Sequence, residues 1–310
     1  MLMKDGVTGR QVPRKLQILL VIAGLTALGC AAAGSPNEAS SAPSEGLPEV
    51  IVKAQRAELE PRVSKFVYGI AGLENDEGIP RWRIPACPYV AGIPQQEGEF
   101  AVGRIAEVAR TAGVPLGGEH CRPNLIIIVT PDPKVLFVGM TDKTRLLTFG
   151  GAHTRVIDDF IATSRPVKVW YKTLIATPEG EIMGDAERTD VDEAAFGIPP
   201  VAAETAYARH NVIWIFSRIL VVVDQTRLQL VTRGQFADYI AMVSLAELRP
   251  GAHLGDAPTI LKLFDGTPQD APPGMSAWDQ AFLKSVYSTS QTSKGQRAQI
   301  TSTIVREIAH

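Results

Sequence analysis

Apolar residues along the chain follow two different periods, and their order predicts a mixture of strands and helices. The runs Asn124–Thr130 and Ile213–Val223 are continuous and rich in β-branched residues, which is typical of strands covered on both faces. Pro166–Leu174 alternates along its length and predicts another strand. We also expect a short strand at Glu49–Ala54 and an extended segment at Arg81–Val90, where two prolines favour the edge of a sheet.

Other stretches repeat apolar residues every three to four positions, as amphipathic helices do. Phe100–Ala112 is the clearest of them, and Gly113 is the glycine that commonly ends a helix. Ser276 followed by Asp279 has the spacing of a capping box, so a helix is expected to begin there. Further helices are predicted at Pro61–Ala71, Pro131–Val138, Val156–Ala162 and Thr292–Ile308.

The stretch Gly234–Leu248 directly follows the most strand-like run and reads as a buried helix. It is rich in Ala and other apolar residues, and its only acidic side chains are Asp238 and Glu247. A strand that leads into an apolar helix is a common place for an active site, but this helix offers almost no reactive groups. The pattern therefore leaves two interpretations open: an ordinary core helix, or a catalytic helix whose catalytic groups are missing.

The first 33 residues have the three parts of a secretory signal peptide. A basic segment precedes the apolar run Leu16–Leu28, and small residues follow it. The apolar run is shorter than the roughly 20 residues of a membrane span, although an uncleaved anchor is the alternative. Cleavage before Cys30 would give a lipoprotein, whereas Ala31–Ala33 fits a signal-peptidase site of the A-x-A type. We favour lipidation of Cys30.

Residues 34–48 are small, polar and proline-containing, and they predict a flexible linker to one domain at 49–310. Cys87 and Cys121 are the thiols that remain after the signal peptide. An even pair in an oxidising compartment predicts a disulfide, which would tie down the helix between them; two reduced, buried thiols are the alternative.

The composition limits the classes of function. A chain of 310 residues with 45% hydrophobic residues can bury one sizeable core, and the order of elements favours an α+β fold with a mixed sheet. A net charge of −2 and the lack of a basic stripe give no reason to expect a nucleic-acid partner. The sequence has no G-x-S-x-G motif, and none of its five His lies four residues from another. Because these motifs are missing, we expect no catalytic residues, no bound metal and no cofactor.

The last third of the chain resembles the C-terminal half of a metzincin-type zinc protease, and more closely a family of uncharacterised secreted proteobacterial proteins and lipoproteins with that layout. In the family pattern a strand leads into a helix with the motif H-E-x-x-H-x-x-G-x-x-H. At the same spacing this chain has Ala237 and Ala241 for the first two His, and Asp238 for the general-base Glu. Ser244 stands for the Gly and Glu247 for the third ligand.

The resemblance continues beyond the helix. Leu261 takes the place of the turn Met, and the segment from Ser276 to Asp279 leads to Tyr287, where the family has an Asp near the start of a helix and a Tyr at its end. One carboxylate cannot hold a catalytic zinc ion, which needs three protein ligands. The resemblance thus implies a zincin-like single domain without its zinc ligands, with Asp238, Glu247 and Tyr287 as candidates for a remnant cleft.

From these observations we expect an exported envelope protein, periplasmic or tethered by a lipid, that is not an enzyme. It would bind an unidentified envelope protein or peptide and touch the membrane only through an N-terminal lipid. One alternative is a hydrolase with a non-zinc carboxylate site, in which Asp238, Glu247, His253 and Tyr287 surround one cleft. Another is a structural subunit of an assembly.

Overall fold

The structure, a computed structural model, describes residues 49–71, 78–139, 160–184, 201–202, 212–249, 251–290 and 295–309. All of them belong to the unit that runs from Leu47 to His310. The predicted signal peptide (1–33), Cys30 and the linker (34–48) lie outside the described residues, and so does most of the predicted helix Val156–Ala162. Within the described ranges, no helix combines the length and the apolar character needed to cross a membrane.

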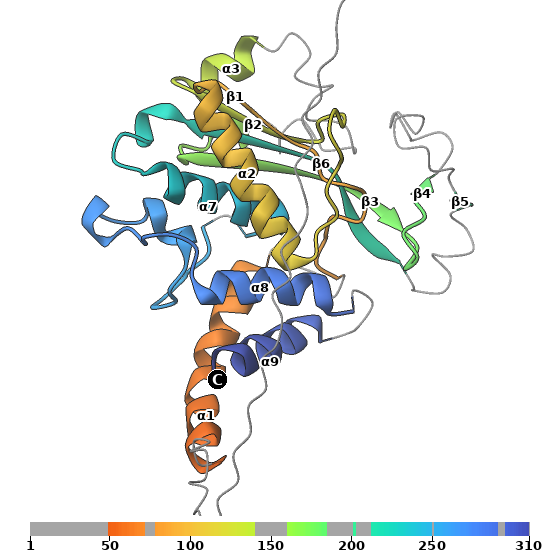
Figure 1. Cartoon of the computed structure of the whole chain (residues 1–310), viewed down its shortest axis with the longest axis vertical. Coiled ribbons are helices and arrows are strands. Elements are labelled where there is room, and N and C mark those ends of the chain that lie inside the picture. Colours follow the sequence, from red (N-terminus) through yellow and green to blue (C-terminus); the bar gives the residue numbers. More distant parts are fainter. Residues whose placement is uncertain are drawn as a thin grey trace, which may run out of the picture. The chain divides into compact units, whose positions relative to one another are not determined.

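A four-stranded mixed sheet forms the centre of this unit, in the order β1-β2-β6-β3 (Figure 1). β1 (Pro88–Ala91), β2 (Leu125–Thr130) and β6 (Ile213–Asp224) run parallel to one another. β3 (Val167–Ala176) pairs antiparallel with β6 and lies at the edge. The two continuous apolar runs are thus the two inner strands, and the proline-flanked strand is an edge strand, as the sequence predicted. The fold is α+β.

Helices cover both faces of the sheet. On one face lie α2 (Gln95–Ala112) and α7 (Arg233–Leu245), which share a single apolar core with one side of β2, β3 and β6. On the other face α3 (Pro133–Gly139) brings Phe137 against the ring of Phe160, which in turn contacts Trp170 of β3. A short parallel pair, β4 (Met183–Gly184) and β5 (Val201–Ala202), forms a second small sheet.

The remaining helices, α1 (Glu49–Ile70), α8 (Ala277–Ser288) and α9 (Gln296–Ile308), pack together below the sheet in Figure 1. Phe66 of α1 makes edge-to-face ring contacts with Trp278 and Phe282 of α8. Because these rings are almost fully buried, they join the helical group to the main core.

The prediction of a strand at Glu49–Ala54 is wrong, since α1 begins at Glu49 and continues through Pro61. The β-branched residues that suggested a strand are followed at 54–60 by Ala, Gln, Arg, Leu and Glu, which are strong helix formers. In the described residues no neighbouring strand offers backbone partners to this segment. A helix satisfies its own backbone groups without a partner, so it extends toward the N-terminus.

Two predicted helix boundaries are confirmed. α2 ends at Gly113, which has φ 83° and whose amide donates to the carbonyl of Arg110. α8 begins after Ser276, whose hydroxyl accepts from the amide of Asp279 while the Asp279 carboxylate accepts from the amide of Ser276. Both features were readable from local sequence because the partners lie within four residues of each other.

The disulfide between Cys87 and Cys121 is also present, with a Cα–Cα distance of 6.0 Å. Cys87 directly precedes β1, and Cys121 lies shortly before β2, so the bond joins the entries of two paired strands around helix α2. Gly117 packs directly against it: a Cβ atom at this position would lie 2.6 Å from the Sγ of Cys121.

We therefore expect Gly117→Ala to destabilise the protein by about 1–3 kcal/mol, the usual cost of overpacking a tight site. The neighbouring Gly118 is the matched control, because a Cβ there would meet no atom within 4 Å. Urea denaturation of both variants measures the difference. Equal midpoints for Gly117→Ala and Gly118→Ala would contradict the close approach.

Candidate functional site

Helix α7 is fixed at its N-terminus by local sequence and by one distant contact. The Thr232 hydroxyl accepts from the amide of Gln235, and the Gln235 side chain accepts from the amide of Thr232, which forms a capping box. The Gln235 side-chain amide also donates to the carbonyl of Pro272 (2.8 Å). The helix therefore starts at a defined position relative to the segment that leads into α8.

At its C-terminus, α7 ends inside the protein, and three aromatic side chains donate to its last carbonyls. The Tyr171 hydroxyl donates to Val243 (2.9 Å), the Trp82 indole to Ser244 (2.9 Å) and the Tyr287 hydroxyl to Leu245 (2.6 Å). The last carbonyls of a helix have no partner within the helix, so a buried end requires donors of this kind. Burial raises the pKa of the hydroxyls of Tyr171 and Tyr287, which keeps both protonated as donors.

Ala237 and Ala241, which the resemblance aligns with two zinc-binding His, are completely buried in the main core. They belong to the packed interior of α7, which lies alongside α2. Small side chains here allow close packing, and a metal ion would have no access to them. Among the described residues, no group of three or more His, Cys, Asp or Glu side chains is arranged to hold a metal ion.

Asp238, at the position of the general base, acts as a link between elements. Its Oδ1 accepts from the Nε of Arg104 on α2 (2.6 Å), and its Oδ2 accepts from the amide of Met275 (2.7 Å). The hydrogen bond with Asp238 raises the pKa of the Arg104 guanidinium. Gly274 is needed beside it, since a Cβ atom there would lie 2.7 Å from Oδ2. This carboxylate is occupied by structural partners.

Asp279, the acidic residue near the start of the last matched helix, is also structural. Its buried carboxylate accepts from the Thr259 hydroxyl (2.5 Å) and the Ile260 amide (2.9 Å), besides its bonds to Ser276. Burial raises the pKa of the Asp279 carboxyl, while these hydrogen bonds oppose the rise. The residue thus holds the turn before Leu261 against the start of α8.

Asp238, Glu247, His253 and Tyr287 do not meet around one cleft. None of the principal cavities in the described part of the chain is lined by more than one of them. Tyr287 is half-buried, with its hydroxyl bonded to the end of α7, and His253 is exposed in the following loop. Glu247 is half-buried, and burial raises the pKa of its carboxyl. The proposed hydrolase site therefore has no common location in this structure.

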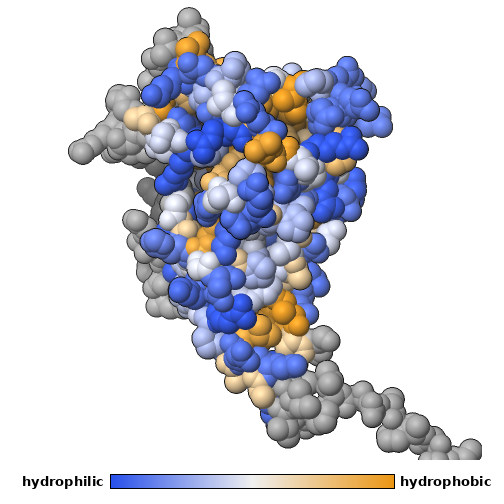
Figure 2. Space-filling view, turned by 90° about the vertical axis from the view of Figure 1, so that its left-hand side faces the viewer, coloured by the Kyte–Doolittle hydropathy of each residue, from blue (hydrophilic) through white to orange (hydrophobic). Residues whose placement is uncertain are grey.

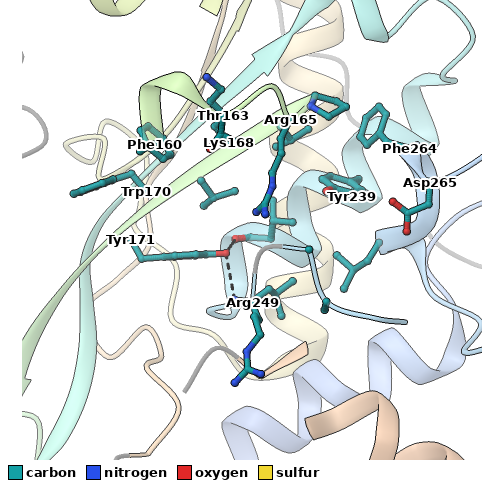
Figure 3. A pocket seen from close by; sticks show the side chains of 18 of the residues that line it. Phe160, Thr163, Arg165, Lys168, Trp170, Tyr171, Tyr239, Arg249, Phe264 and Asp265 are labelled. Atoms are coloured by element: carbon teal, nitrogen blue, oxygen red, sulfur yellow. Dashed lines mark hydrogen bonds between the residues drawn. The ribbon is translucent and has the colours of Figure 1, made fainter. Parts of the chain in front are cut away.

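A different group of residues lines a cavity of about 560 Å³ between β3 and α7 (Figure 3). One wall is β3 and the segment before it, and the other is α7 with the chain that follows it. The apolar lining includes Val167, Val169, Val243, Leu261 and Phe264. Its size and mainly apolar walls are those of a site that takes a side chain or a small apolar group.

The polar side chains that line this cavity are those of Thr163, Arg165, Lys168, Tyr171, Tyr239, Arg249 and Asp265. The Tyr171 hydroxyl is engaged with Val243 and with the amide of Leu248 (3.4 Å), and the Lys168 ammonium donates to the carbonyl of Ile161 (2.7 Å). Burial lowers the pKa of Lys168. Arg165 and Tyr239 also reach into the cavity (Figure 3). The face of the molecule drawn in Figure 2 is mainly hydrophilic, with apolar residues in small separate groups. We take the cavity, with its apolar walls, as the candidate site.

The sequence did not reveal this site. Arg165 was one of many isolated basic residues, and Tyr239 and Val243 looked like ordinary helix residues within an apolar stretch. The cavity combines segments that are far apart in the chain, and no motif joins them. Comparisons with models of known protein families, with curated proteins and with solved structures found no match.

Removing the Tyr287 hydroxyl should test its role at the end of α7. Tyr287→Phe leaves the Leu245 carbonyl and the Trp82 amide (3.2 Å from the hydroxyl) without this partner. We expect a loss of about 1–3 kcal/mol in the free energy of unfolding, measured by urea denaturation. Tyr68→Phe is the control, because Tyr68 is 46% exposed; a similar loss in both variants would contradict the role.

Glu247 should make stability depend on pH. In the folded protein the pKa of Glu247 lies above the usual 4.5, so the unfolded chain loses this proton at a lower pH than the folded chain does. The free energy of unfolding therefore falls as pH rises from the unfolded pKa to the folded pKa. Glu247→Gln should therefore be more stable than the parent protein at neutral pH, and the difference should vanish below about pH 4. Thermal unfolding from pH 4 to 8 measures this, with Glu58→Gln on the exposed side of α1 as control. A difference that is constant with pH would refute the assignment.

Proposed function

We propose that this chain is an exported, non-catalytic binding module with a zincin-like frame, and that it holds an extended peptide of an envelope partner in the cavity between β3 and α7. The observation that carries the proposal is the position of this cavity beside the edge of β3. In the described part of the chain, no strand pairs with that edge between Val167 and Tyr171.

The hydrogen-bond pattern of β3 supports strand addition. The amide of Asp224 donates to the carbonyl of Pro166 (2.9 Å), and Val167 pairs with Val223. In an antiparallel ladder, a hydrogen bond between the flanking residues Asp224 and Pro166 makes Val167 and Val223 a non-hydrogen-bonded pair. The backbone N–H and C=O groups of such a pair point away from the partner strand. The N–H and C=O groups of Val167, Val169 and Tyr171, which precede the register shift after Lys172, therefore face away from β6.

These outward groups belong to the same residues whose side chains line the cavity, namely Val167, Val169 and Tyr171. An extended peptide that pairs with them would place alternate side chains toward α7. Backbone pairing gives affinity that depends little on sequence, and the pocket adds selectivity, as in other cases of strand addition. The free edge and the cavity thus fit one ligand.

Two further observations support the remaining parts of the proposal. The order β6, α7, the turn at Leu261 and the capped helix ending near Tyr287 follows the layout implied by the resemblance to zinc proteases. The buried alanines at positions 237 and 241 agree with a frame that has exchanged metal binding for packing. The disulfide between Cys87 and Cys121 suits an oxidising compartment, as export requires.

Substitution of Val169 by proline tests the proposal. Because the Val169 amide points away from β6, Val169→Pro removes a donor from the free edge without breaking the ladder. We expect this variant to keep its cooperative unfolding transition. The amount of a random octapeptide library that it retains should fall at least about tenfold, because the loss of one hydrogen bond of about 1.5 kcal/mol lowers affinity about tenfold.

Val169→Thr is the matched control, because it keeps both the amide and the β-branched shape and should retain peptides as the parent does. Equal retention by Val169→Pro and the parent protein would show that peptides do not pair with this edge.

A further inference from the structure

The cavity between β3 and α7 carries its free polar groups at one end. Arg165 lies two residues before β3, and its side chain crosses toward the loop after α7: its Nη2 is 3.1 Å from the position a Cβ would take on Gly251. The residue is exposed, and the described residues include no carboxylate that pairs with it within 4.0 Å. A guanidinium placed over an apolar cavity is suited to bind a planar anion.

Tyr239 supplies a second donor in the same cavity. Its ring packs edge to face against Phe264, with ring centroids 5.0 Å apart, which fixes its orientation. Burial raises the pKa of Tyr239 to about 12, so its hydroxyl remains protonated at neutral pH. The negative charge of Asp265 adds to this rise in the pKa of Tyr239, and the positive charge of Arg165 opposes it. Figure 3 shows Arg165 and Tyr239 in the same part of the cavity.

The other polar groups of the lining contribute little to the recognition of an anion. The Lys168 ammonium and the Tyr171 hydroxyl are engaged with backbone groups of the protein. Thr163 and Arg249 also line the cavity, and each has an interaction of its own within the protein. Asp265 is the acidic side chain among the lining residues, and it lies on the far side of Tyr239 from Arg165 in Figure 3. A ligand group beside Arg165 and Tyr239 therefore meets donors, and a carboxylate is the complementary acceptor.

The direction of β3 indicates that the carboxylate beside Arg165 is the C-terminus of a bound peptide. Arg165 precedes the first residue of β3, and a strand that adds antiparallel to β3 has its C-terminal end beside that point. A parallel strand would place its positively charged amino terminus, or the middle of its chain, next to the guanidinium. Charge complementarity thus favours an antiparallel peptide that ends at Arg165.

We propose that the ligand is the C-terminal segment of a partner protein, bound antiparallel to β3, with an apolar last side chain in the cavity and its α-carboxylate held by Arg165 and Tyr239. This inference rests on the proposed function, because it names the class of peptide that the same site accepts. It goes further in requiring a free chain end, which an internal segment of a protein cannot supply.

Two pools of random octapeptides test it, one with free C-terminal acids and one with C-terminal amides. We expect the full-length protein to enrich peptides with an apolar last residue from the acid pool, and the best acids to bind about tenfold more tightly than their amides. Such a ratio corresponds to one charge-assisted hydrogen bond. Fluorescence anisotropy of labelled acid and amide pairs measures it.

Variants then assign the carboxylate to its partners. Arg165→Gln should lower the affinity for each acid to that for its matched amide, and Tyr239→Phe should reduce the difference between acid and amide. Arg227→Gln is the matched control, since Arg227 is also exposed but lies outside this cavity. An unchanged preference in Arg165→Gln would overturn the assignment.

The remaining outcomes separate this inference from the proposed function. Equal enrichment from both pools would overturn recognition of the chain end and leave peptide binding intact. No enrichment from either pool would overturn both. Decanoate is a fatty acid that could also occupy the cavity. If it displaces the peptides and binds equally well to Val169→Pro, the cavity recognises a fatty acid instead of a peptide terminus.

Discussion

The buried C-terminus of α7 is the constraint on which the rest of the structure depends. A helix that ends inside a protein leaves carbonyls that must find donors, and here they find Tyr171, Trp82 and Tyr287. These donors come from β3, from the segment before β1 and from α8. One helix end therefore fixes the relative positions of the edge strand and the helical group. The rings of Tyr171, Phe216 and Trp82 pack in series and hold this arrangement in the core.

The same constraint sets the distance between β3 and α7, and thus creates the cavity. Tyr171 reaches from β3 to the end of α7, so its hydroxyl joins the two elements beside the cavity that Arg165 and Tyr239 also line. At the other side of α7, Asp238 ties the helix to Arg104 and Met275. Asp238, which the resemblance aligns with a catalytic Glu, positions the helix through these bonds. Ala237 and Ala241 beside it are buried in the core.

Local signals in the sequence predicted much of the fold. The runs that became β2 and β6, the glycine after α2 and the capping box of α8 were readable because each depends on neighbouring residues or on burial of both faces. The disulfide followed from the count of cysteines. The strand expected at Glu49–Ala54 failed because a strand depends on a partner elsewhere in the chain. The cavity was missed for the same reason: Arg165, Val169 and Tyr239 become neighbours only through the pairing of β3 with β6.

Helix α7 packs in the main core and forms one wall of the cavity, and the proposed function predicts that the protein binds no metal. Elemental analysis of the full-length protein, purified without chelators and dialysed against metal-free buffer, tests this most directly. The account predicts zinc far below one equivalent per chain and an unfolding transition that does not change when a chelator is added. One equivalent of zinc that survives dialysis, and whose removal lowers the unfolding temperature, would contradict it.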